Sequence, residues 1–202
     1  MGQAVVIRHG ETTWSAAGRH TGRTDVPLTE GGRRQAEALS KALADHPFDL
    51  ILTSPLGRAR LTCELAGFGD QAEVEPDLAE WDYGEFEGLT TNEIRERIPA
   101  WSIWTHPPDK GESLDDLATR ADRVIGRVTG VAGDVALFGH SHALRVLTAR
   151  WLRLAPSAGS GFVLETGAIG VLGWDREFPA VVRWNYRSDV PADQNPDRGV
   201  SR

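Results

Sequence analysis

The sequence has almost none of the features that secreted or membrane-bound chains share. Cys63 is the only cysteine among 202 residues, so no disulfide can form within the chain, and a reducing cytoplasm fits best. No apolar run approaches the length of a membrane span, and no signal-peptide pattern precedes the first apolar residues. Val6 stands where a myristoylation motif has Ser or Thr. We therefore expect a cytoplasmic protein with no membrane partner.

Positive charge is also scarce. The chain has 22 Lys and Arg against 29 Asp and Glu, a formal net charge of −7, and a surface of that sign repels nucleic acid and anionic membranes. A small anionic substrate can still bind where arginines gather in a local pocket. No triad of metal ligands with recognisable spacing occurs in the sequence, so we expect no metal site and no cofactor.

Short apolar runs alternate with helical patterns along the chain. The runs predict buried strands, and the spacing of apolar residues between them predicts amphipathic helices. This alternation indicates an α/β fold, a three-layer α/β/α sandwich in which helices cover both faces of a mostly parallel sheet. We expect a single domain over residues 1–190. The predicted strands are 4–7, 50–52, 73–75, 134–138, 167–174 and 180–186.

Polar residues mark where the helices between these strands are expected to begin. Thr29 is predicted to cap a helix that ends at Pro47. Ser54-Pro55 is predicted to begin the next helix, with proline in its first turn. Ser113 is expected to form a capping box, and Ser141 to cap the helix after the strand at 134–138.

Two segments interrupt this regular pattern. Residues 77–111 hold several tryptophans and prolines, and we expect a small inserted lobe there with one short helix near 90–97. Trp101 and Trp104 in this lobe have two interpretations, a lid over the substrate or packing of the lobe's own core. Residues 191–202 are rich in polar residues and proline or glycine, which predicts a flexible tail.

Three predicted strand ends carry residues suited to phosphate chemistry. The first strand ends in Arg8-His9, the second is followed by Arg58, and the strand at 134–138 is followed by His140. Because ligands bind beyond the carboxyl ends of parallel strands, we expect these side chains to converge there. A neutral imidazole can attack phosphorus, and arginines can stabilise the charge on the phosphate oxygens. His9 is therefore the candidate nucleophile.

Taken singly, each of these residues has a plainer interpretation. Arg58 alone is typical of a solvated helix charge, and His140 with His142 is compatible with a capped loop or a pair of metal ligands in a metallohydrolase. A phosphatase also needs a carboxylic acid to protonate the leaving oxygen. The acids of residues 77–88 do not differ enough in their setting for the pattern alone to select one.

Five blocks of sequence, in order, resemble the histidine phosphatase superfamily, also called the phosphoglycerate mutase-like family. The resemblance covers about residues 4–175. The blocks are Ile7-Arg-His-Gly-Glu-Thr-Thr-Trp14, Thr21-Gly-Arg-Thr-Asp-Val-Pro-Leu-Thr-Glu-Gly-Gly32, Ser54-Pro-Leu-Gly-Arg-Ala59, Leu78-Ala-Glu-Trp-Asp-Tyr-Gly-Glu-Phe-Glu-Gly88 and Gly139-His-Ser141.

The resemblance implies a phosphoglycerate mutase-like fold and assigns roles to residues. His9 corresponds to the phosphorylated nucleophile, and Glu80 corresponds to the proton donor. A homodimer is compatible with the family. The phosphate pocket is completed by Arg8, Arg58 and His140, and the implied substrate contacts are Ser15, Thr21, Gly22, Tyr83 and Ser141.

The family divides into mutases, which return the phosphoryl group to a sugar acid, and phosphatases, which transfer it to water. The inserted lobe is short and has only Arg95 and Arg97 before Lys110, whereas mutases have a longer basic insertion. Ser15 stands where those mutases usually have Asn. We therefore favour a phosphatase for sugar phosphates or a broad range of small phosphomonoesters. The alternative is a cofactor-dependent phosphoglycerate mutase primed by 2,3-bisphosphoglycerate.

A function of another class is a non-catalytic domain that binds phosphorylated ligands. Such a domain would be expected to have lost the nucleophile or the acid, whereas His9 and Glu80 are both present. His20 is expected to be an exposed loop residue rather than a substrate contact. Cys63 fits a small buried helix position and is assigned no role.

Overall fold

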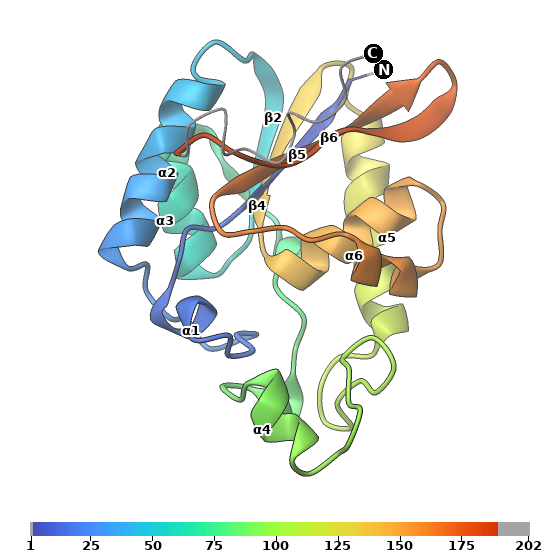
Figure 1. The fold of residues 1–202 in the computed structure, drawn as a ribbon. Coiled ribbons are helices and arrows are strands. Elements are labelled where there is room, and N and C mark those ends of the chain that lie inside the picture. Colours follow the sequence, from blue (N-terminus) through green and yellow to red (C-terminus); the bar gives the residue numbers. More distant parts are fainter. Residues whose placement is uncertain (1, 190–202) are drawn as a thin grey trace, which may run out of the picture.

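The computed structural model describes residues 2–189, and a six-stranded sheet lies at its centre (Figure 1). The spatial order of the strands is β3-β2-β4-β1-β5-β6. The first four in this order are parallel, whereas β5 pairs antiparallel with β1, and β6 pairs antiparallel with β5. The strands are β1 (Ala4–Arg8), β2 (Phe48–Thr53), β3 (Glu73–Val74), β4 (Asp134–Gly139), β5 (Ala168–Asp175) and β6 (Phe178–Arg187).

Helices cover both faces of this sheet (Figure 1). Helices α2 and α3 pack on one face, and α5 and α6 pack on the other. The three-layer α/β/α sandwich with a mostly parallel sheet is therefore confirmed. The helices are α1 (Thr13–Ala16), α2 (Glu30–Leu43), α3 (Gly57–Leu65), α4 (Thr91–Arg95), α5 (Leu114–Thr129) and α6 (Ser141–Trp151), and short 3-10 helices lie at Gly69–Gln71, Pro76–Leu78, Gly84–Phe86 and Pro156–Gly161.

The side chains of β1 contribute to two hydrophobic cores, one on each face of the sheet. Successive side chains of a strand point to opposite faces of the sheet. Ala4 and Val6 therefore pack in the cluster beneath α5 and α6, whereas Val5 and Ile7 pack in the cluster beneath α2 and α3. A strand that is covered on both faces has no polar side, which explains the unbroken apolar run at the N-terminus.

Two helices begin at other residues than the sequence suggested, because distant carboxylates cap them. Helix α3 begins at Gly57, not at Ser54-Pro55, and the Asp25 carboxylate accepts the Gly57 N–H at 2.8 Å. Ser141 is the first residue of α6 rather than its cap, and the backbone N–H groups of that first turn are satisfied by Glu80. The predicted caps are residues next to each helix, whereas the observed capping carboxylates come from distant segments of the chain.

The other helix predictions have a mixed outcome. Thr29 caps α2, as expected, through its hydroxyl and the Gly32 N–H. Ser113 caps α5, but its hydroxyl donates to the Asp116 carboxylate, so the reciprocal capping box does not form. Helix α1 was not predicted from the sequence, and it is stabilised by a capping box between Thr12 and Ser15.

The inserted lobe has the expected short helix, α4, and its tryptophans form its core. Trp101 is 1% exposed, donates from Nε1 to the His106 carbonyl at 3.0 Å, and packs edge-on against Phe86. Trp104 packs edge-on against the buried Trp81. The indoles therefore take the packing role rather than that of a lid.

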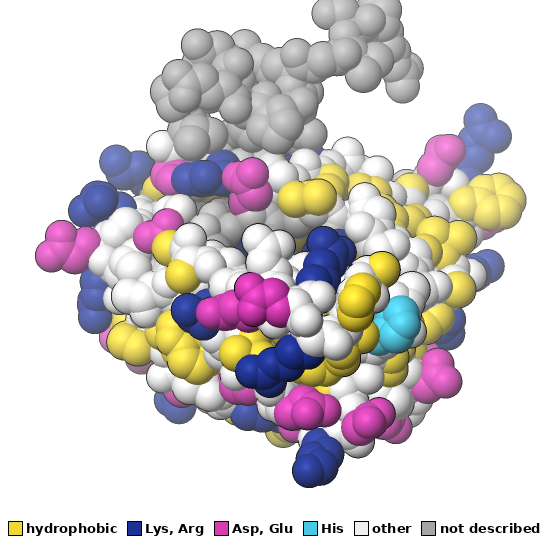
Figure 2. Space-filling view, turned by 60° about the horizontal axis from the view of Figure 1, so that its bottom comes forward, with side chains coloured by type: hydrophobic (Ala, Val, Ile, Leu, Met, Phe, Trp, Pro, Cys, Tyr) yellow, Lys and Arg dark blue, Asp and Glu magenta, His cyan; other side chains and the backbone are white. Residues whose placement is uncertain are grey.

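The face that includes the lobe has no single charged patch. Lys and Arg side chains are interspersed with Asp and Glu side chains across it (Figure 2). Within the described part of the chain, no helix is long and apolar enough to cross a membrane. The predicted tail at 191–202 lies outside the described residues.

Candidate active site

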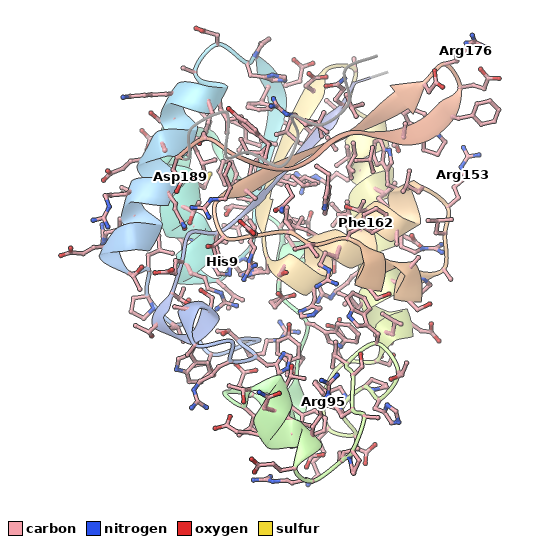
Figure 3. The ribbon with its side chains drawn as sticks, in the orientation of Figure 1. His9, Arg95, Arg153, Phe162, Arg176 and Asp189 are labelled. Atoms are coloured by element: carbon pink, nitrogen blue, oxygen red, sulfur yellow. The ribbon has the colours of Figure 1, made fainter. Side chains whose placement is uncertain are left out.

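The three strand ends come together at one edge of the sheet, as their positions predicted, although Arg58 and His140 themselves are not among the residues that line the pocket. The His9 N–H donates to the Gly139 carbonyl at 3.0 Å, and the rings of His9 and His140 lie 5.1 Å apart. His9 lies at the carboxyl end of β1 and faces the space between the sheet and the lobe (Figure 3). The pocket has a volume of about 170 Å³, and its lining residues are Arg8, His9, Ser15, Gly18, Arg19, His20, Thr21, Glu80, Tyr83, Ser141 and His142.

Gly10 and Gly32 allow the backbone of the loop after His9 to lie directly against the backbone of the first turn of α2. A Cβ atom on Gly10 would lie 2.2 Å from the Gly32 carbonyl oxygen, and one on Gly32 would lie 2.1 Å from the Glu11 carbonyl oxygen. No other residue fits at either position without moving backbone. The Gly10 N–H is held by the Thr62 hydroxyl at 3.1 Å. The loop that carries His9 is thus held between the first turn of α2 and the Thr62 hydroxyl of α3.

His9 is oriented as a nucleophile. Its Nδ1 lies 2.7 Å from the Gly10 carbonyl oxygen. Because a carbonyl oxygen only accepts, Nδ1 carries the ring hydrogen, and Nε2 retains its lone pair. Burial, followed by the charges of Arg8 and Arg58, lowers the pKa of His9 well below its usual value. The ring is therefore neutral at pH 7.

Arg58 is a buried cation held by the loop at 21–24. Its side chain is fully buried, and it donates to the carbonyl oxygens of Thr24, Thr21 and Gly22 at 2.8 to 3.0 Å. Asp25 lies 3.8 Å from the guanidinium and also accepts the Arg58 N–H. Three carbonyls and one carboxylate thus fix the position of this charge beside His9.

Arg8 and His140 complete the polar end of the pocket. Arg8 donates from Nη1 to the Leu164 carbonyl at 2.6 Å. His140 Nε2 lies 2.7 Å from the Ser54 hydroxyl, which also accepts the Leu56 N–H. When that hydroxyl donates to Nε2, the hydrogen of His140 lies on Nδ1. Burial, with the charge of Arg58 next, lowers the pKa of His140 well below its usual value.

Three donors around His9 share one property. Over residues 2–189, the buried side-chain nitrogens without a hydrogen-bond partner are Arg8 Nε, Arg58 Nε and His140 Nδ1. Buried donors are normally paired, because an unpaired one carries a desolvation cost of about 1–3 kcal/mol. All three belong to residues that lie near His9, so together they form a cradle that an anion with several acceptor oxygens can satisfy.

Glu80 lies in the same pocket and is held by backbone donors. Its carboxyl accepts the N–H groups of Trp81 at 2.9 Å, His142 at 3.1 Å and Ala143 at 2.9 Å. Two of these donors belong to the first turn of α6, the helix that His140 precedes. The side chain is 4% exposed. A single carboxyl group therefore closes a helix terminus and lines the pocket.

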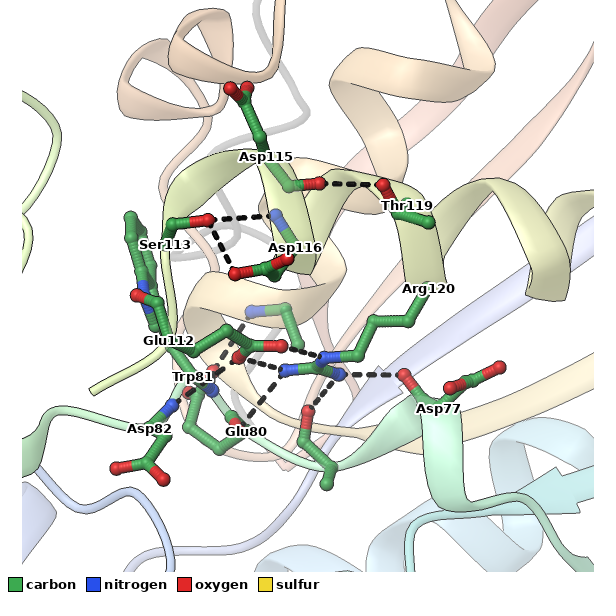
Figure 4. A network of polar contacts seen from close by, with 12 residues as sticks. Asp77, Glu80, Trp81, Asp82, Glu112, Ser113, Asp115, Asp116, Thr119 and Arg120 are labelled. Atoms are coloured by element: carbon green, nitrogen blue, oxygen red, sulfur yellow. Dashed lines mark hydrogen bonds and ion pairs between the residues drawn. The ribbon is translucent and has the colours of Figure 1, made fainter. Parts of the chain in front are cut away.

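Arg120 of α5 supports the segment that carries Glu80 (Figure 4). Its guanidinium donates to the carbonyl oxygens of Asp77 at 2.7 Å, Ala79 at 2.6 Å and Glu80 at 3.1 Å. It also forms a two-pronged ion pair with Glu112, in which both side chains are largely buried. Arg120 thus joins the segment from Asp77 to Glu80 to helix α5.

A second group of rings lines the pocket beyond the arginines. The Tyr83 hydroxyl lies 2.6 Å from His142 Nδ1. Burial raises the pKa of Tyr83 well above its usual value and lowers the pKa of His142 well below its own. The neutral tyrosine therefore donates to the neutral imidazole. His20 packs against Tyr83 at 4.9 Å, and its expected exposure is wrong, because it is partly buried in the pocket wall.

The remaining predicted substrate contacts already have partners within the protein. The Ser15 hydroxyl donates to the Thr12 carbonyl in the capping box of α1, although Ser15 still lines the pocket. The Thr21 hydroxyl donates to the Arg19 carbonyl at 3.1 Å. The Gly22 N–H donates to the Glu87 carboxylate, and Gly22 is not among the lining residues. Ser141 lines the pocket through the first turn of α6.

The geometry gives no support to a metal pair at His140 and His142. His140 Nε2 contacts Ser54, and His142 Nδ1 contacts Tyr83. In the part of the chain that the structure describes, no group of three or more His, Cys, Asp or Glu side chains is placed to hold a metal ion. Cys63 is buried on α3, and burial raises the pKa of its thiol to about 12.

The sequence reading missed the residues that hold the site together. These are Ser54, Asp25, Glu87 and Arg120, which position His140, Arg58, Gly22 and Glu80. Asp25 and Glu87 lie inside the blocks quoted for the resemblance, so a search for partners of the buried arginine could have found them. No sequence pattern indicated a role for Arg120, because it lies on an ordinary amphipathic helix 40 residues from Glu80.

Comparison with known proteins agrees with this geometry. A family model for the histidine phosphatase superfamily (branch 1) matches residues 4–187. The chain belongs to the histidine phosphatase superfamily. An acid phosphatase of Mycobacterium tuberculosis is 42% identical over 175 residues, which cover 85% of this chain and 86% of that protein.

Two further relatives of this superfamily member cover most of its length. Sedoheptulose 1,7-bisphosphatase of Saccharomyces cerevisiae is 34% identical over 184 residues, covering 75% of this chain and 68% of that one. A solved structure of an open reading frame product of Mycobacterium tuberculosis superposes with a TM-score of 0.89 at 38% identity. It covers 93% of this chain and 98% of that one. The phosphoglycerate mutase-like fold is thereby established.

Proposed function

We propose that the protein is a phosphatase that hydrolyses small phosphomonoesters through a phosphohistidine intermediate on His9. The substrates are sugar phosphates or a broad range of small phosphates. The observation that carries the proposal is the position of neutral His9 among the unpaired buried donors of Arg8, Arg58 and His140. The kinship with an acid phosphatase and a sugar bisphosphatase supports it.

In the first step, the lone pair of His9 Nε2 forms a bond to phosphorus, and the bond from phosphorus to the ester oxygen breaks. Arg8, Arg58 and His140 hold the three non-bridging oxygens as charge spreads over them. Glu80 gives its proton to the leaving oxygen, which departs as an alcohol. The Gly10 carbonyl keeps the Nδ1 hydrogen in place, so the imidazole stays in the reactive tautomer.

In the second step, a water molecule takes the place of the alcohol and attacks phosphorus. The carboxylate of Glu80 takes a proton from that water, and the bond from phosphorus to Nε2 breaks, returning its electron pair to His9. Inorganic phosphate leaves, and both residues regain their starting protonation states. Ser15, Thr21, Tyr83 and Ser141, which line the pocket, are proposed to bound the space for the alcohol.

We propose that turnover requires no metal ion, because two arginines and a histidine supply the donors that the transferring phosphoryl group needs. Full activity in excess chelator is the expected result, and activity that returns only with added metal would contradict it. 2,3-Bisphosphoglycerate is needed only under the mutase alternative.

The experiment that tests the function is a phosphate-release screen over sugar phosphates, phosphoglycerates and an aryl phosphate, run beside a mutase assay with 2,3-bisphosphoglycerate. We expect phosphate release from several substrates and little mutase activity. Strong mutase activity with little phosphate release would overturn the phosphatase branch. Binding of phosphate without turnover of any substrate would favour the non-catalytic alternative.

We further propose a cytoplasmic location and no nucleic-acid partner. The single buried cysteine and the net charge of −7 support these two statements. The homodimer that the family resemblance allows is tested by light scattering on the purified chain.

A further inference from the structure

The active-site pocket has two ends of different character. The phosphate end is formed by Arg8 and His9, with Arg58 and His140 behind them. A second group of lining residues is here called the alcohol end. It contains the adjoining rings of His20, Tyr83 and His142, and it also includes Gly18, Arg19 and Thr21. Under the function proposed above, on which this inference rests, the alcohol end receives the rest of the substrate.

Arg19 is the cation of the alcohol end, and its charge is already matched. It donates from Nη1 to the Gly88 carbonyl at 2.6 Å and to the Glu93 carboxylate at 3.2 Å, and Nη2 reaches the same carboxylate at 3.4 Å. Glu93 is fixed in turn, because it also accepts the Thr90 N–H in the capping box of α4. The charge of this arginine is therefore matched by a neighbouring carboxylate that is not itself a lining residue.

The other titratable groups of the alcohol end are neutral at pH 7. Burial lowers the pKa of His20 to about 4 and that of His142 well below its usual value. Tyr83 donates its hydrogen to His142 Nδ1, so the hydrogen of His142 lies on Nε2. These rings can donate or accept single hydrogen bonds, but they offer no charge.

The arginines next to this wall are engaged as well. Arg145 donates to the carbonyl oxygens of Gly159 and Ser160 at 3.0 Å each, with its guanidinium over the Trp104 ring. Arg23 pairs with Asp82 at 3.6 Å. The interspersed charges on this face agree with that pairing (Figure 2). Among the buried side chains of residues 2–189, the cationic donors without a hydrogen-bond partner are Arg8 Nε and Arg58 Nε.

We propose that the alcohol end takes an uncharged, hydroxyl-bearing carbon chain and selects against a carboxylate or a second phosphate at that place. A hydroxyl group both donates and accepts, which suits neutral imidazole and phenol partners. An anion there would lose hydration, meet no unpaired cation and lie near Glu93. The preferred substrates are therefore phosphomonoesters of small polyols or sugars rather than phosphorylated acids.

A matched pair of substrates tests this directly. Glycerol 3-phosphate and 3-phosphoglycerate differ only in a hydroxymethyl group against a carboxylate. We expect kcat/KM for glycerol 3-phosphate to be higher by about 10-fold or more, the size of effect that one unpaired buried charge can produce. Similar values, or a preference for 3-phosphoglycerate, would overturn the inference. Aryl phosphate turnover with no measurable turnover of glycerol 3-phosphate would overturn it too.

An aryl phosphate separates the failure of this inference from the failure of the proposed function. If the wild-type protein hydrolyses no aryl phosphate under any condition, then the phosphatase proposal itself fails. If it does, the matched pair reports on the alcohol end alone.

A single variant should shift the preference. Glu93→Gln removes the anion paired with Arg19, while glutamine keeps the capping box of α4. We expect kcat/KM for 3-phosphoglycerate to rise by about 3- to 10-fold, with that for glycerol 3-phosphate changed by less than about 2-fold. Asp122→Asn, which removes the partner of Arg150 on the outer face of α5 and α6, is the control and should leave the ratio unchanged. An unchanged ratio in Glu93→Gln would contradict the role of the pairing.

Discussion

The carboxyl group of Glu80 accepts the backbone N–H of Ala143 at 2.9 Å, so the proposed proton donor is also a cap of helix α6. His140 immediately precedes that helix. The acid and one arm of the phosphate cradle are therefore fixed to the same rigid element. This contact ties the carboxyl group of Glu80, which belongs to the inserted segment 77–111, to the helix of the sandwich that follows His140.

Glu80→Gln separates the chemical role of this residue from its structural one. The glutamine carbonyl can still accept the N–H groups of Trp81 and Ala143, although not that of His142, so the fold should survive, but the amide has no acidic proton. We expect kcat to fall by about 10²- to 10⁴-fold for an alkyl phosphate. The loss should be much smaller for formation of the phospho-enzyme from an aryl phosphate, because its leaving oxygen needs no proton. Rapid-quench measurement of that step checks this, and equal losses for both substrates would contradict the assignment.

Arg120 is expected to act on catalysis through Glu80. Arg120→Lys keeps a positive charge near Glu112 but cannot reach the three carbonyls together, because lysine lacks the planar fork. We expect the rate of phospho-enzyme formation from alkyl phosphates to fall by about 10-fold, more than the rate from aryl phosphates, since a small displacement of the acid impairs protonation of the leaving oxygen most.

The neighbouring Arg123 provides the control for that experiment. It lies on the same helix and pairs with the Asp77 carboxylate in an exposed ion pair. Arg123→Lys should change the free energy of unfolding by no more than about 0.5 kcal/mol and should leave the alkyl-to-aryl ratio unchanged. If Arg120→Lys lowers both rates equally, then Arg120 is structural and does not position Glu80.

Buried neutral histidines should make the fold sensitive to mild acid. The pKa of His20 is lowered to about 4, and those of His9, His140 and His142 are also lowered. Between about pH 6.5 and 5 the unfolded chain therefore binds protons that the folded chain does not. The free energy of unfolding must fall as the pH falls through this range.

The size of this effect can be measured at one position. Each such histidine contributes a slope of up to about 1.4 kcal/mol per pH unit below pH 6.5. Urea unfolding at pH 7, 6 and 5 should show a shallower slope for His20→Gln than for the wild type. His106→Gln, at an exposed position, serves as the control. If the free energy of unfolding of His20→Gln has the same pH slope as the wild type, then the pKa of His20 is the same in the folded and unfolded states. That result would contradict the prediction.

The strands and the convergence of the site could be predicted because both depend on local patterns. An apolar run of four residues between polar ones identifies β1, and parallel strands end at the same edge of the sheet. The starts of α3 and α6 could not be predicted in this way, since Asp25 and Glu80 cap them from 32 and 62 residues away. A capping residue from another segment produces no pattern in the sequence next to the helix that it caps.

The site shows the same division between local and distant signals. His9, Arg58 and His140 follow strands and were predictable as a pocket, whereas Glu80 was chosen among several acids only through the family resemblance. His20 lies in a loop, and its neighbours predict an exposed side chain, but Trp101 of the lobe packs against its ring. Contacts of this kind depend on tertiary packing, which no local spacing encodes.

The central claim is that His9 carries the phosphoryl group, and trapping that intermediate tests it most directly. Glu80→Gln should accumulate the phospho-enzyme from an aryl phosphate, because it forms without a proton donor but lacks the base that activates water. The protein is denatured at neutral pH, and its peptides are examined by mass spectrometry. We expect one phosphoryl group on the peptide that contains His9 and none when His9→Ala is added. Phosphorylation of another residue, or turnover retained by His9→Ala, would contradict the account.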